Sequence, residues 1–351
     1  MNHSKVAIIG AGPAGISCAV QLKRYGIEPV LFEKKQIGGL LRNANLVENY
    51  LGFENGISGK DLVEKFKTNL KISDITPILS EVKKISFTEG IFRLETTNGL
   101  FTSKILVIAS GTKPRELNTF CHLKHSCHPE RSKGSVQLIN TTTVQKWTDS
   151  SAMPQNDNKK IFYEIADLPK KDYSGKKFAI IGAGDTAFDY AINLVNNYKV
   201  SEVVILNRSD KAKCLPLLEK RAEETGKIKH IKNIQVDLIS QPVIASDQRE
   251  RGNLSIVKNS QSIRLLRRCT PRNDDSIIMD TDYIIVAIGR EENRDFLNEN
   301  LTKNSSDLQN QELLYFIGDV ANGSYRQSSI ATGDGIKAAM KINSKINTIY
   351  L

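Results

Sequence analysis

The sequence lacks a run of eighteen or more apolar residues, the minimum that a membrane-spanning helix requires. No apolar leader precedes the first predicted strand, so we expect neither a secretory signal nor a membrane partner and predict a cytoplasmic protein. Cysteine is scarce as well. Five cysteines, an odd number, spread over 351 residues do not make a disulfide scaffold.

The composition is otherwise that of an ordinary globular chain, with 40% hydrophobic and 25% charged residues. A length of 351 residues predicts about two domains. The formal net charge of +10 favours an anionic cofactor or an acidic partner. The basic residues are scattered and no aromatic residues are interleaved with them, so we expect no nucleic-acid partner.

Residues 5–35 predict a strand, a glycine-rich turn, a helix and a second strand. The turn reads GAGPAG over residues 10–15. Gly10 permits the tight turn, Gly12 lets backbone approach a pyrophosphate, and Gly15 lets helix and strand pack closely. The free N–H groups of the helix N-terminus favour phosphate there. Glu33 ends the second strand, where its carboxylate can accept hydrogen bonds from ribose hydroxyls.

The same pattern returns at residues 178–206, with GAGDTA over residues 182–187 as its turn. Here the second strand ends without a carboxylate, in Asn-Arg-Ser, and two lysines follow. Arg208 and Lys213 suit a ribose 2′-phosphate, which favours NADP, with NAD left open. Two such units in one chain indicate an internal duplication and an α/β fold.

Other segments complete the predicted architecture. Residues 85–111 predict short strands separated by turns at residues 88–90 and 97–99, and the last strand is continuously apolar. Residues 283–287 and 314–317 predict two more buried strands, and residues 334–346 a closing helix.

Residues 118–160 are polar and aperiodic, and we predict a disordered insertion there. Within it, two cysteines and three histidines lie between Cys121 and His128. Their spacing matches no closed zinc site and no second ligand pair accompanies them, so we predict no metal.

Five further motifs give the chain a family resemblance. They are Gly38-Gly39 followed by residues 47–50, then residues 109–112, 286–289, Gly318-Asp319 and residues 325–327. With the first glycine turn, they make the chain similar to the low-molecular-weight thioredoxin reductases and to the thioredoxin-reductase-like ferredoxin–NADP reductases. The resemblance covers most of the chain outside the polar insertion.

The resemblance implies two Rossmann-like, three-layer ββα dinucleotide-binding domains, with an NAD(P)H domain inserted into a discontinuous FAD domain. The implied divisions are residues 1–117 and 288–351 for FAD, 118–160 for the insertion and 161–287 for NAD(P)H. It also implies a homodimer, an NADPH domain that swings, and hinges near residues 113–118 and 288–291.

The resemblance also assigns cofactor-binding residues. Those expected around FAD are Gly10, Gly12, Pro13, Ala14, Gly15, Glu33, Gly38, Gly39, Leu40, Asn49, Gly111, Gly289, Gly318, Asp319, Arg326 and Gln327. Those expected around NADP are Gly182, Gly184, Asp185, Thr186, Ala187, Arg208 and Lys213. No catalytic side chain is expected, because the cofactors carry the chemistry.

One departure from the thioredoxin reductases concerns their redox dithiol. They carry Cys-x-x-Cys just before the second glycine turn, whereas residues 161–168 here contain no cysteine. Thiol–disulfide exchange within the chain therefore does not carry over. The positive charge favours an acidic carrier such as ferredoxin or flavodoxin as electron acceptor. Two alternatives stay open: a thioredoxin-disulfide reductase-like enzyme acting on another acceptor, and a non-catalytic flavin-binding sensor or decayed enzyme.

Overall fold

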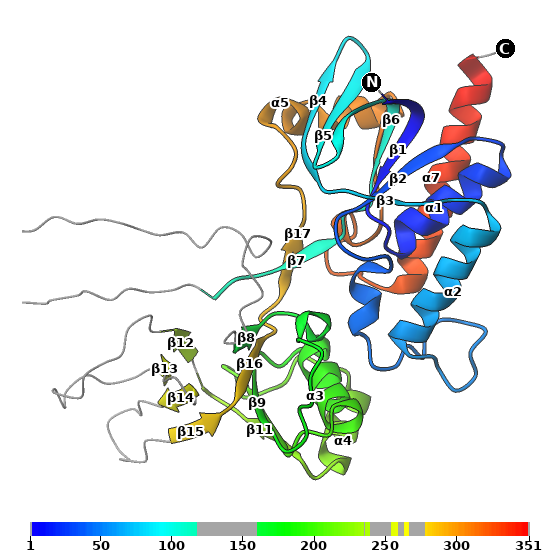
Figure 1. Cartoon of the computed structure of the whole chain (residues 1–351). Helices are drawn as coiled ribbons and strands as arrows, with labels where there is room; N and C mark the ends of the chain where they lie inside the picture. The colour runs from blue at the N-terminus through cyan, green and yellow to red at the C-terminus, as the bar shows by residue number, and fades with distance from the viewer. Residues whose placement is uncertain are drawn as a thin grey trace, which may run out of the picture.

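The computed structural model describes residues 2–117, 160–234, 236–238, 254–258, 263–266 and 278–349. The predicted insertion, with its cysteine and histidine cluster, lies outside the described residues except for Lys160. Figure 1 shows two units, which we call the first and second unit, connected by a two-stranded ribbon. No helix in the described ranges is long and apolar enough to cross a membrane.

The first unit is built on a seven-stranded sheet with the order β3-β2-β1-β6-β5-β4, in which β18 also pairs with β6. The strands are β1 (Asn2–Ile9), β2 (Pro29–Glu33), β3 (Ile78–Leu79), β4 (Val82–Thr88), β5 (Ile91–Thr96), β6 (Gly99–Ile108) and β18 (Leu314–Phe316). Strands β3, β2, β1, β6 and β18 run parallel, whereas β4 and β5 form an antiparallel extension. Because β18 comes from the far end of the chain, the unit is discontinuous in sequence.

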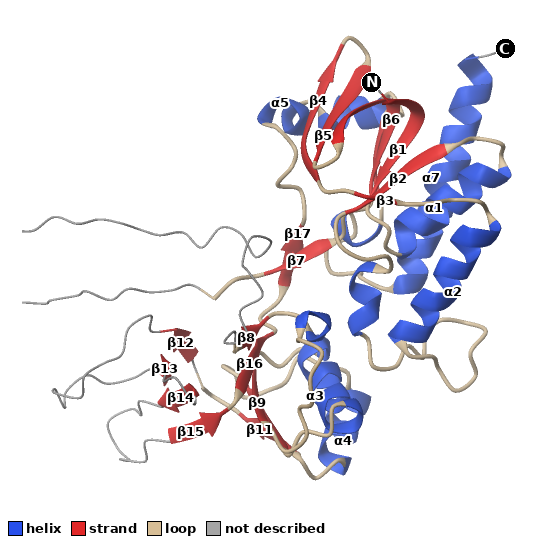
Figure 2. Cartoon of the chain, in the orientation of Figure 1, coloured by secondary structure: helices blue, strands red, loops and turns tan. Residues whose placement is uncertain are grey.

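Three helices cover one face of this sheet: α1 (Pro13–Arg24), α2 (Gly59–Ile72) and α7 (Ser328–Ile349), as Figure 2 shows. A proline in the first turn starts α1, and the Ser58 hydroxyl caps α2 by accepting from the Asp61 N–H. Helix α7 packs closely on α1 because Gly335 faces it. A Cβ at that position would lie 2.3 Å from the Ala14 carbonyl oxygen.

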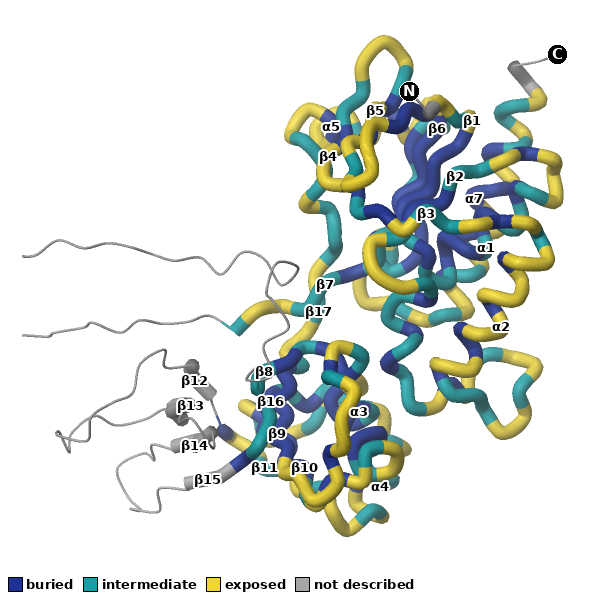
Figure 3. The backbone as a smooth tube through the Cα atoms, viewed as in Figure 1, coloured by how far each residue is buried: buried dark blue, intermediate teal, exposed yellow. Residues whose placement is uncertain are grey.

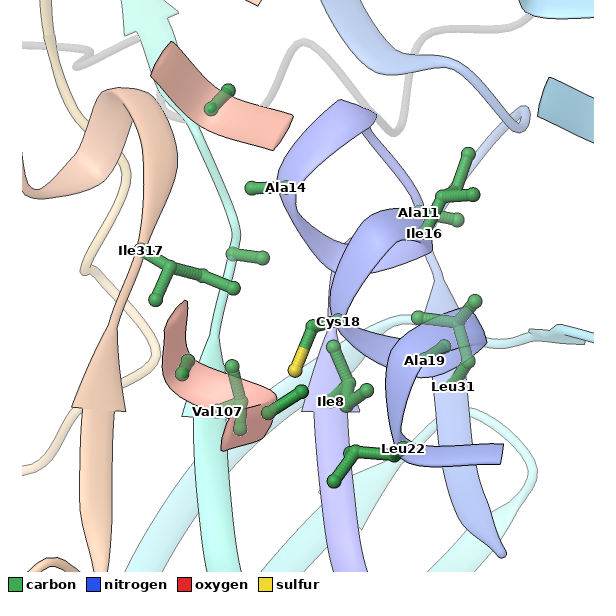
Figure 4. Close-up of a cluster of buried hydrophobic side chains, with 14 of the residues drawn as sticks. Ile8, Ala11, Ala14, Ile16, Cys18, Ala19, Leu22, Leu31, Val107 and Ile317 are labelled. Atoms are coloured by element: carbon green, nitrogen blue, oxygen red, sulfur yellow. The ribbon is translucent and has the colours of Figure 1, made fainter. Parts of the chain in front are cut away.

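The sheet and these helices enclose the main core. In Figure 4, Cys18 and Leu22 of α1 lie with Ile8, Val107 and Ile317 in one buried cluster. Figure 3 shows the same burial along the central strands of both units. On the other side of the sheet, α5 (Glu299–Lys303) and α6 (Ser305–Asn310) contribute to a second buried cluster.

The second unit repeats the plan with a five-stranded parallel sheet of order β11-β10-β9-β16-β8. Its strands are β8 (Ile161–Phe162), β9 (Lys177–Ile181), β10 (Glu202–Leu206), β11 (Ile228–Ile231) and β16 (Tyr283–Val286). Helices α3 (Asp185–Asn197) and α4 (Pro216–Glu224) lie on one side in Figure 1. A four-stranded sheet lies on the other, comprising β12 (Val236–Leu238), β13 (Leu254–Lys258), β14 (Ile263–Leu266) and β15 (Ile278–Thr281).

These layers confirm the predicted α/β class with two Rossmann-like units, the second inserted in sequence between β6 and β18 of the first. The ribbon that connects them pairs β7 (Thr112–Pro114) with β17 (Arg290–Glu292) antiparallel. It coincides with the predicted hinge segments, but their role as hinges stays a prediction.

The predicted elements exist, and the differences concern mainly their ends. The closing helix spans Ser328–Ile349 rather than residues 334–346. The first helix begins at Pro13, inside the glycine turn that was predicted to precede it. The sequence did not lead us to expect α2, although its apolar residues recur at helical spacing.

Candidate functional site

The first glycine turn has its required geometry at the carboxyl end of β1. Gly10 has a φ of +102°, and a Cβ there would lie 2.4 Å from the Ala109 carbonyl oxygen. A Cβ on Gly15 would lie 1.9 Å from the Gly10 carbonyl oxygen, so helix and strand need glycine at this contact. By contrast, a Cβ on Gly12 would have no atom of any other described residue within 4 Å, apart from its chain neighbours and the backbone of its own helix.

Gly12 is also the N-cap of α1, and no side chain caps the helix there. The N–H groups in the first turn of an uncapped helix have no intrahelical acceptor. Together with Pro13 and Ala14, they leave room and hydrogen-bond donors for an anion in front of the helix.

Glu33 lies at the end of β2, beside this turn. Its Oε2 accepts from the Ala11 N–H at 2.9 Å and its Oε1 accepts from the Lys35 N–H at 2.9 Å. A carboxylate has about four lone-pair sites, so two such bonds fix its orientation and still leave acceptor capacity for hydroxyl groups.

The second glycine pair lies against the first turn. The Gly38 N–H donates to the Ala11 carbonyl at 2.7 Å, and a Cβ on Gly39 would lie 3.5 Å from the Gly12 Cα. Gly39 and Leu40 begin the short 3-10 helix η1 (Gly39–Asn43). The loop that contains Gly38 and Gly39 therefore lies directly against Gly12 of the first glycine turn.

The start of α7 meets this region from the other side. The Asn49 amide donates from Nδ2 to the Gln327 Oε1 at 2.8 Å, and the Ser329 hydroxyl donates to the Asn49 carbonyl at 3.2 Å. Gly318 brings the 3-10 helix η3 (Gly318–Val320) against α1, because a Cβ there would lie 2.8 Å from the Ala14 Cβ.

Two charged side chains in this region, those of Asp319 and Arg326, have polar atoms without a hydrogen-bond partner among the described residues. Burial raises the pKa of Asp319, and Arg326 and Arg290 oppose the shift. Its carboxylate makes no hydrogen bond within the described part of the chain. The Arg326 Nε is buried and has no hydrogen-bond partner among the described residues. Because buried polar atoms are normally hydrogen-bonded, these two side chains are candidates for contact with a polar ligand.

Gly111 and Gly289 lie at the ends of the ribbon rather than at the glycine turns. The Asn293 N–H donates to the Gly111 carbonyl at 3.1 Å, and the Arg115 N–H donates to the Gly289 carbonyl at 3.0 Å. Both glycines have positive φ, +65° and +110° respectively. Each glycine thus lies immediately before one strand of the ribbon, Gly111 before β7 and Gly289 before β17.

Taken together, these residues fit a dinucleotide with a polar, sugar-like chain. The uncapped helix and the open space at Gly12 suit a pyrophosphate, and Glu33 suits a ribose. Asp319 and Arg326 offer an acceptor and a donor that have no hydrogen-bond partner among the described residues. The observed donor set is consistent with the expected FAD.

The second glycine turn repeats this geometry at the end of β9. Gly182 has a φ of +115°, and a Cβ there would lie 2.2 Å from the Ala287 carbonyl oxygen. Gly184 is the N-cap of α3 and no side chain caps it. Asp185 accepts from the Leu215 N–H at 2.8 Å, which fixes the loop that follows β10. Thr186 and Ala187 complete the first turn of α3.

The loop after β10 carries the predicted basic residues. Arg208 and Lys213 are exposed and form no ion pair within the described ranges. The Lys213 N–H donates to the Ala183 carbonyl at 2.8 Å, which holds Lys213 beside the glycine turn. The site is therefore open to an anionic ligand.

Asn207 organises this loop and was not among the residues predicted to bind a cofactor. It is buried, its Oδ1 accepts from the Ser209 N–H at 3.1 Å, and its Nδ2 donates to the Lys211 carbonyl at 3.0 Å. An asparagine followed two residues later by serine at a strand end is the sequence signal that indicates such a turn.

A buried polar cluster at the junction of the units was also missed. It centres on Glu164, which contacts Asn43, Tyr190 and Arg290. Residues 161–168 attracted notice only because they lack cysteine, and nothing in the sequence indicates that their glutamate meets residues over a hundred positions away.

The described cysteines are not poised for redox chemistry. Burial raises the pKa of the Cys18 thiol to about 12, and burial with the nearby Glu219 raises that of Cys214 to about 11. Both are thiols at neutral pH, whereas exchange needs a thiolate. In the described ranges no three His, Cys, Asp or Glu residues are grouped to hold a metal.

Comparison with known proteins places this geometry in a family. A family model described as pyridine nucleotide-disulphide oxidoreductase matches residues 4–335. The thioredoxin reductase of Escherichia coli O157:H7 is 25% identical over 351 residues, which cover 97% of this chain and 95% of that protein. The thioredoxin reductase of Chlamydia pneumoniae is 25% identical over 352 residues, which cover 97% and 98%.

Solved structures agree on the fold. The crystal structure of T. acidophilum thioredoxin reductase superposes with a TM-score of 0.69 at 22% identity, covering 98% of this chain and 99% of that one. At this identity the likeness shows the arrangement of two dinucleotide-binding domains and nothing finer.

Proposed function

Because the chain belongs to the pyridine nucleotide-disulphide oxidoreductase family, we propose that this flavin-dependent enzyme passes electrons from NADPH to an acceptor outside its own chain. Its cofactors are FAD and NADPH. The proposal rests on two glycine turns, one in each unit, each followed by a helix without a side-chain N-cap. It rests also on the lack of a Cys-x-x-Cys pair in the sequence.

In this proposal the first unit binds FAD, which when bound supplies the hydride-accepting and electron-donating chemistry. The N–H groups behind Gly12 hold the pyrophosphate, and Glu33 accepts from the ribose. Asp319 accepts from the ribitol hydroxyls, while Arg326 and Gln327 orient the ring end. These roles need no proton transfer by a side chain.

The second unit binds NADPH in the same proposal. The N–H groups behind Gly184 face its pyrophosphate, and Arg208 and Lys213 pair with the 2′-phosphate. The Asn207 turn supports this assignment because its hydrogen bonds shape the loop that follows Arg208. The bond from the Lys213 N–H to the Ala183 carbonyl keeps Lys213 beside the glycine turn.

The acceptor we propose is a disulfide carried by another molecule. The matched family is named for disulphide chemistry, and the curated relatives are named thioredoxin reductases. Two electrons and two protons break the acceptor's S–S bond and leave two thiols. Since Cys18 and Cys214 are held as thiols, we expect neither of these two cysteines to relay the electrons.

A second candidate acceptor is an acidic one-electron carrier of the ferredoxin or flavodoxin kind. The net charge of +10 favours encounter with such a protein, and no relative named above carries that activity. The homodimer, the cytoplasmic location and the domain boundaries stay predictions, which light scattering and fractionation of the native protein would test.

The test reduces the FAD-loaded protein anaerobically with NADPH and then mixes it with each acceptor. Oxidised thioredoxin, a low-molecular-weight disulfide, a ferredoxin and a flavodoxin are compared by stopped-flow absorbance. We expect one of the disulfides to reoxidise the flavin fastest. Faster reoxidation by the ferredoxin or the flavodoxin would contradict the disulfide proposal and support the second candidate.

A further inference from the structure

Glu164 is a buried carboxylate at the junction of the two units. It precedes the 3-10 helix η2 (Ile165–Asp167) and is only 8% exposed. Its Oε2 accepts from the Asn43 Nδ2 at 2.7 Å and from the Tyr190 hydroxyl at 2.5 Å. Its Oε1 forms an ion pair with the Arg290 Nη1. A buried charge needs such partners, because its desolvation is costly.

The three donors come from three different parts of the molecule. Asn43 ends η1 in the first unit, Tyr190 lies on α3 in the second unit, and Arg290 begins β17 of the ribbon. Arg290 also donates from Nε to the Thr112 Oγ1 at 2.8 Å and from Nη2 to the Thr112 carbonyl at 2.9 Å. One carboxylate thus ties both units to both strands of the ribbon.

Asn43 makes three hydrogen bonds across this junction. It is 5% exposed, its Oδ1 accepts from the Ala166 N–H at 2.9 Å, and its carbonyl accepts from the Asn193 Nδ2 at 3.4 Å. All of these partners belong to the second unit. If the units separated here, the buried groups of the cluster would lose their partners together.

Tyr190 donates its hydroxyl hydrogen to Glu164. Burial, and then the Glu164 carboxylate, raise its pKa well above the usual value, so the phenol keeps its proton. The cluster therefore contains one negative charge, on Glu164, which faces the Arg290 cation and the neutral donors Asn43 and Tyr190.

We propose that Glu164 is a positioning residue that holds the two dinucleotide-binding units and the connecting ribbon in the arrangement seen here. Loss of its charge frees the second unit to move relative to the first while each unit stays folded. The inference goes beyond the proposed function and does not depend on which molecule accepts the electrons.

A second contact between the units offers a matched control. The Arg221 guanidinium donates to both oxygens of Glu48, at 2.6 and 2.8 Å. These side chains are 32% and 44% exposed, so water screens their attraction. An exposed pair contributes little to stability, whereas removing one partner of a buried pair leaves the other charge buried and uncompensated.

The test measures amide hydrogen exchange in Glu164→Gln and Glu48→Gln. Ala166 and Asn45 report on the junction, because the Ala166 N–H bonds to Asn43 and the Asn45 N–H bonds to Asp189 across the units. We expect Glu164→Gln to speed exchange at both amides by about tenfold or more. Amides of β1 and β9 should exchange as in the wild type, and Glu48→Gln should change every rate by less than about threefold.

Unchanged exchange at Ala166 in Glu164→Gln would overturn the proposal. A uniform rise that includes β1 and β9 would also overturn it, because it would give Glu164 a merely structural role. Tyr190→Phe is the milder second variant, should Glu164→Gln fail to fold. It removes one donor, keeps the charge pair, and should raise the Ala166 rate with the sheets unaffected.

Discussion

At the scale of single residues, Gly12 and Gly15 separate folding from ligand binding within one turn. A Cβ at Gly15 would clash with the Gly10 carbonyl oxygen, whereas a Cβ at Gly12 would meet open space. We predict that Gly15→Ala lowers the free energy of unfolding by at least about 2 kcal/mol, in the range of overpacking a close contact. Gly12→Ala should leave stability unchanged and weaken FAD binding about tenfold or more, because its methyl group fills the ligand's space.

These two variants are compared by thermal unfolding of the FAD-free protein and by flavin fluorescence titration. Equal FAD affinity of Gly12→Ala and wild type would refute the placement of the pyrophosphate. A normal melting temperature for Gly15→Ala would show that the helix and strand have more room than the structure gives them.

Asp189 makes a pH-dependent contribution, also at the residue scale. Burial raises its pKa to about 6, although the Asn45 N–H, which it accepts, opposes the shift. The native state therefore keeps a proton on Asp189 that the unfolded state releases near pH 4. The contribution of this group to the free energy of unfolding consequently falls as pH rises from about 4 to 6. The full shift corresponds to at most about 3 kcal/mol.

We predict that Asp189→Asn removes this loss of stability with rising pH. The amide oxygen of asparagine can still accept the hydrogen bond from the Asn45 N–H, but it carries no charge. Urea unfolding of both proteins at pH 4.5 and 6.5 checks it. The variant should gain stability relative to wild type at the higher pH. An equal difference at both pH values would mean that Asp189 does not titrate in this window.

At the scale of elements, the loop after β10 sets the choice of nucleotide in our account. We predict that Arg208→Ala with Lys213→Ala raises the KM for NADPH about tenfold or more and leaves the KM for NADH unchanged, since only NADPH carries the 2′-phosphate. Lys220→Ala, on exposed α4, is the control that should alter neither KM. Steady-state kinetics with both nucleotides would contradict the assignment if the two KM values rose together.

The same scale shows how far sequence reasoning reaches. The periodicity of apolar residues and the spacing of glycines were sufficient to predict β1, α1, β9 and α3, because local sequence signals determine these elements. Helix ends were less accurate, and α7 begins at Ser328, six residues earlier than predicted. Asn49, which is distant in sequence, donates to Gln327 just before this start, and no local sequence signal indicates that contact. Turn glycines were predictable, since Gly10 and Gly182 need φ values that other residues rarely adopt.

At the scale of the whole molecule, the two units meet through polar contacts that no sequence pattern encodes. Glu164 and Arg290 are 126 positions apart, and Glu48 and Arg221 are 173 apart. Their partnership depends on how the ribbon sets the second unit against η1. The exchange experiment on Glu164→Gln therefore addresses the part of the structure that was least predictable.

The central claim, that electrons pass from NADPH to bound FAD, is tested most directly by one anaerobic titration. The purified, FAD-loaded protein is titrated with NADPH, and separately with NADH, while the oxidised-flavin absorbance is followed. Our account predicts that this absorbance is lost as NADPH is added, and at lower concentrations than with NADH. A bound flavin that stays oxidised with both nucleotides would contradict it and leave a flavin-binding protein without reductase activity.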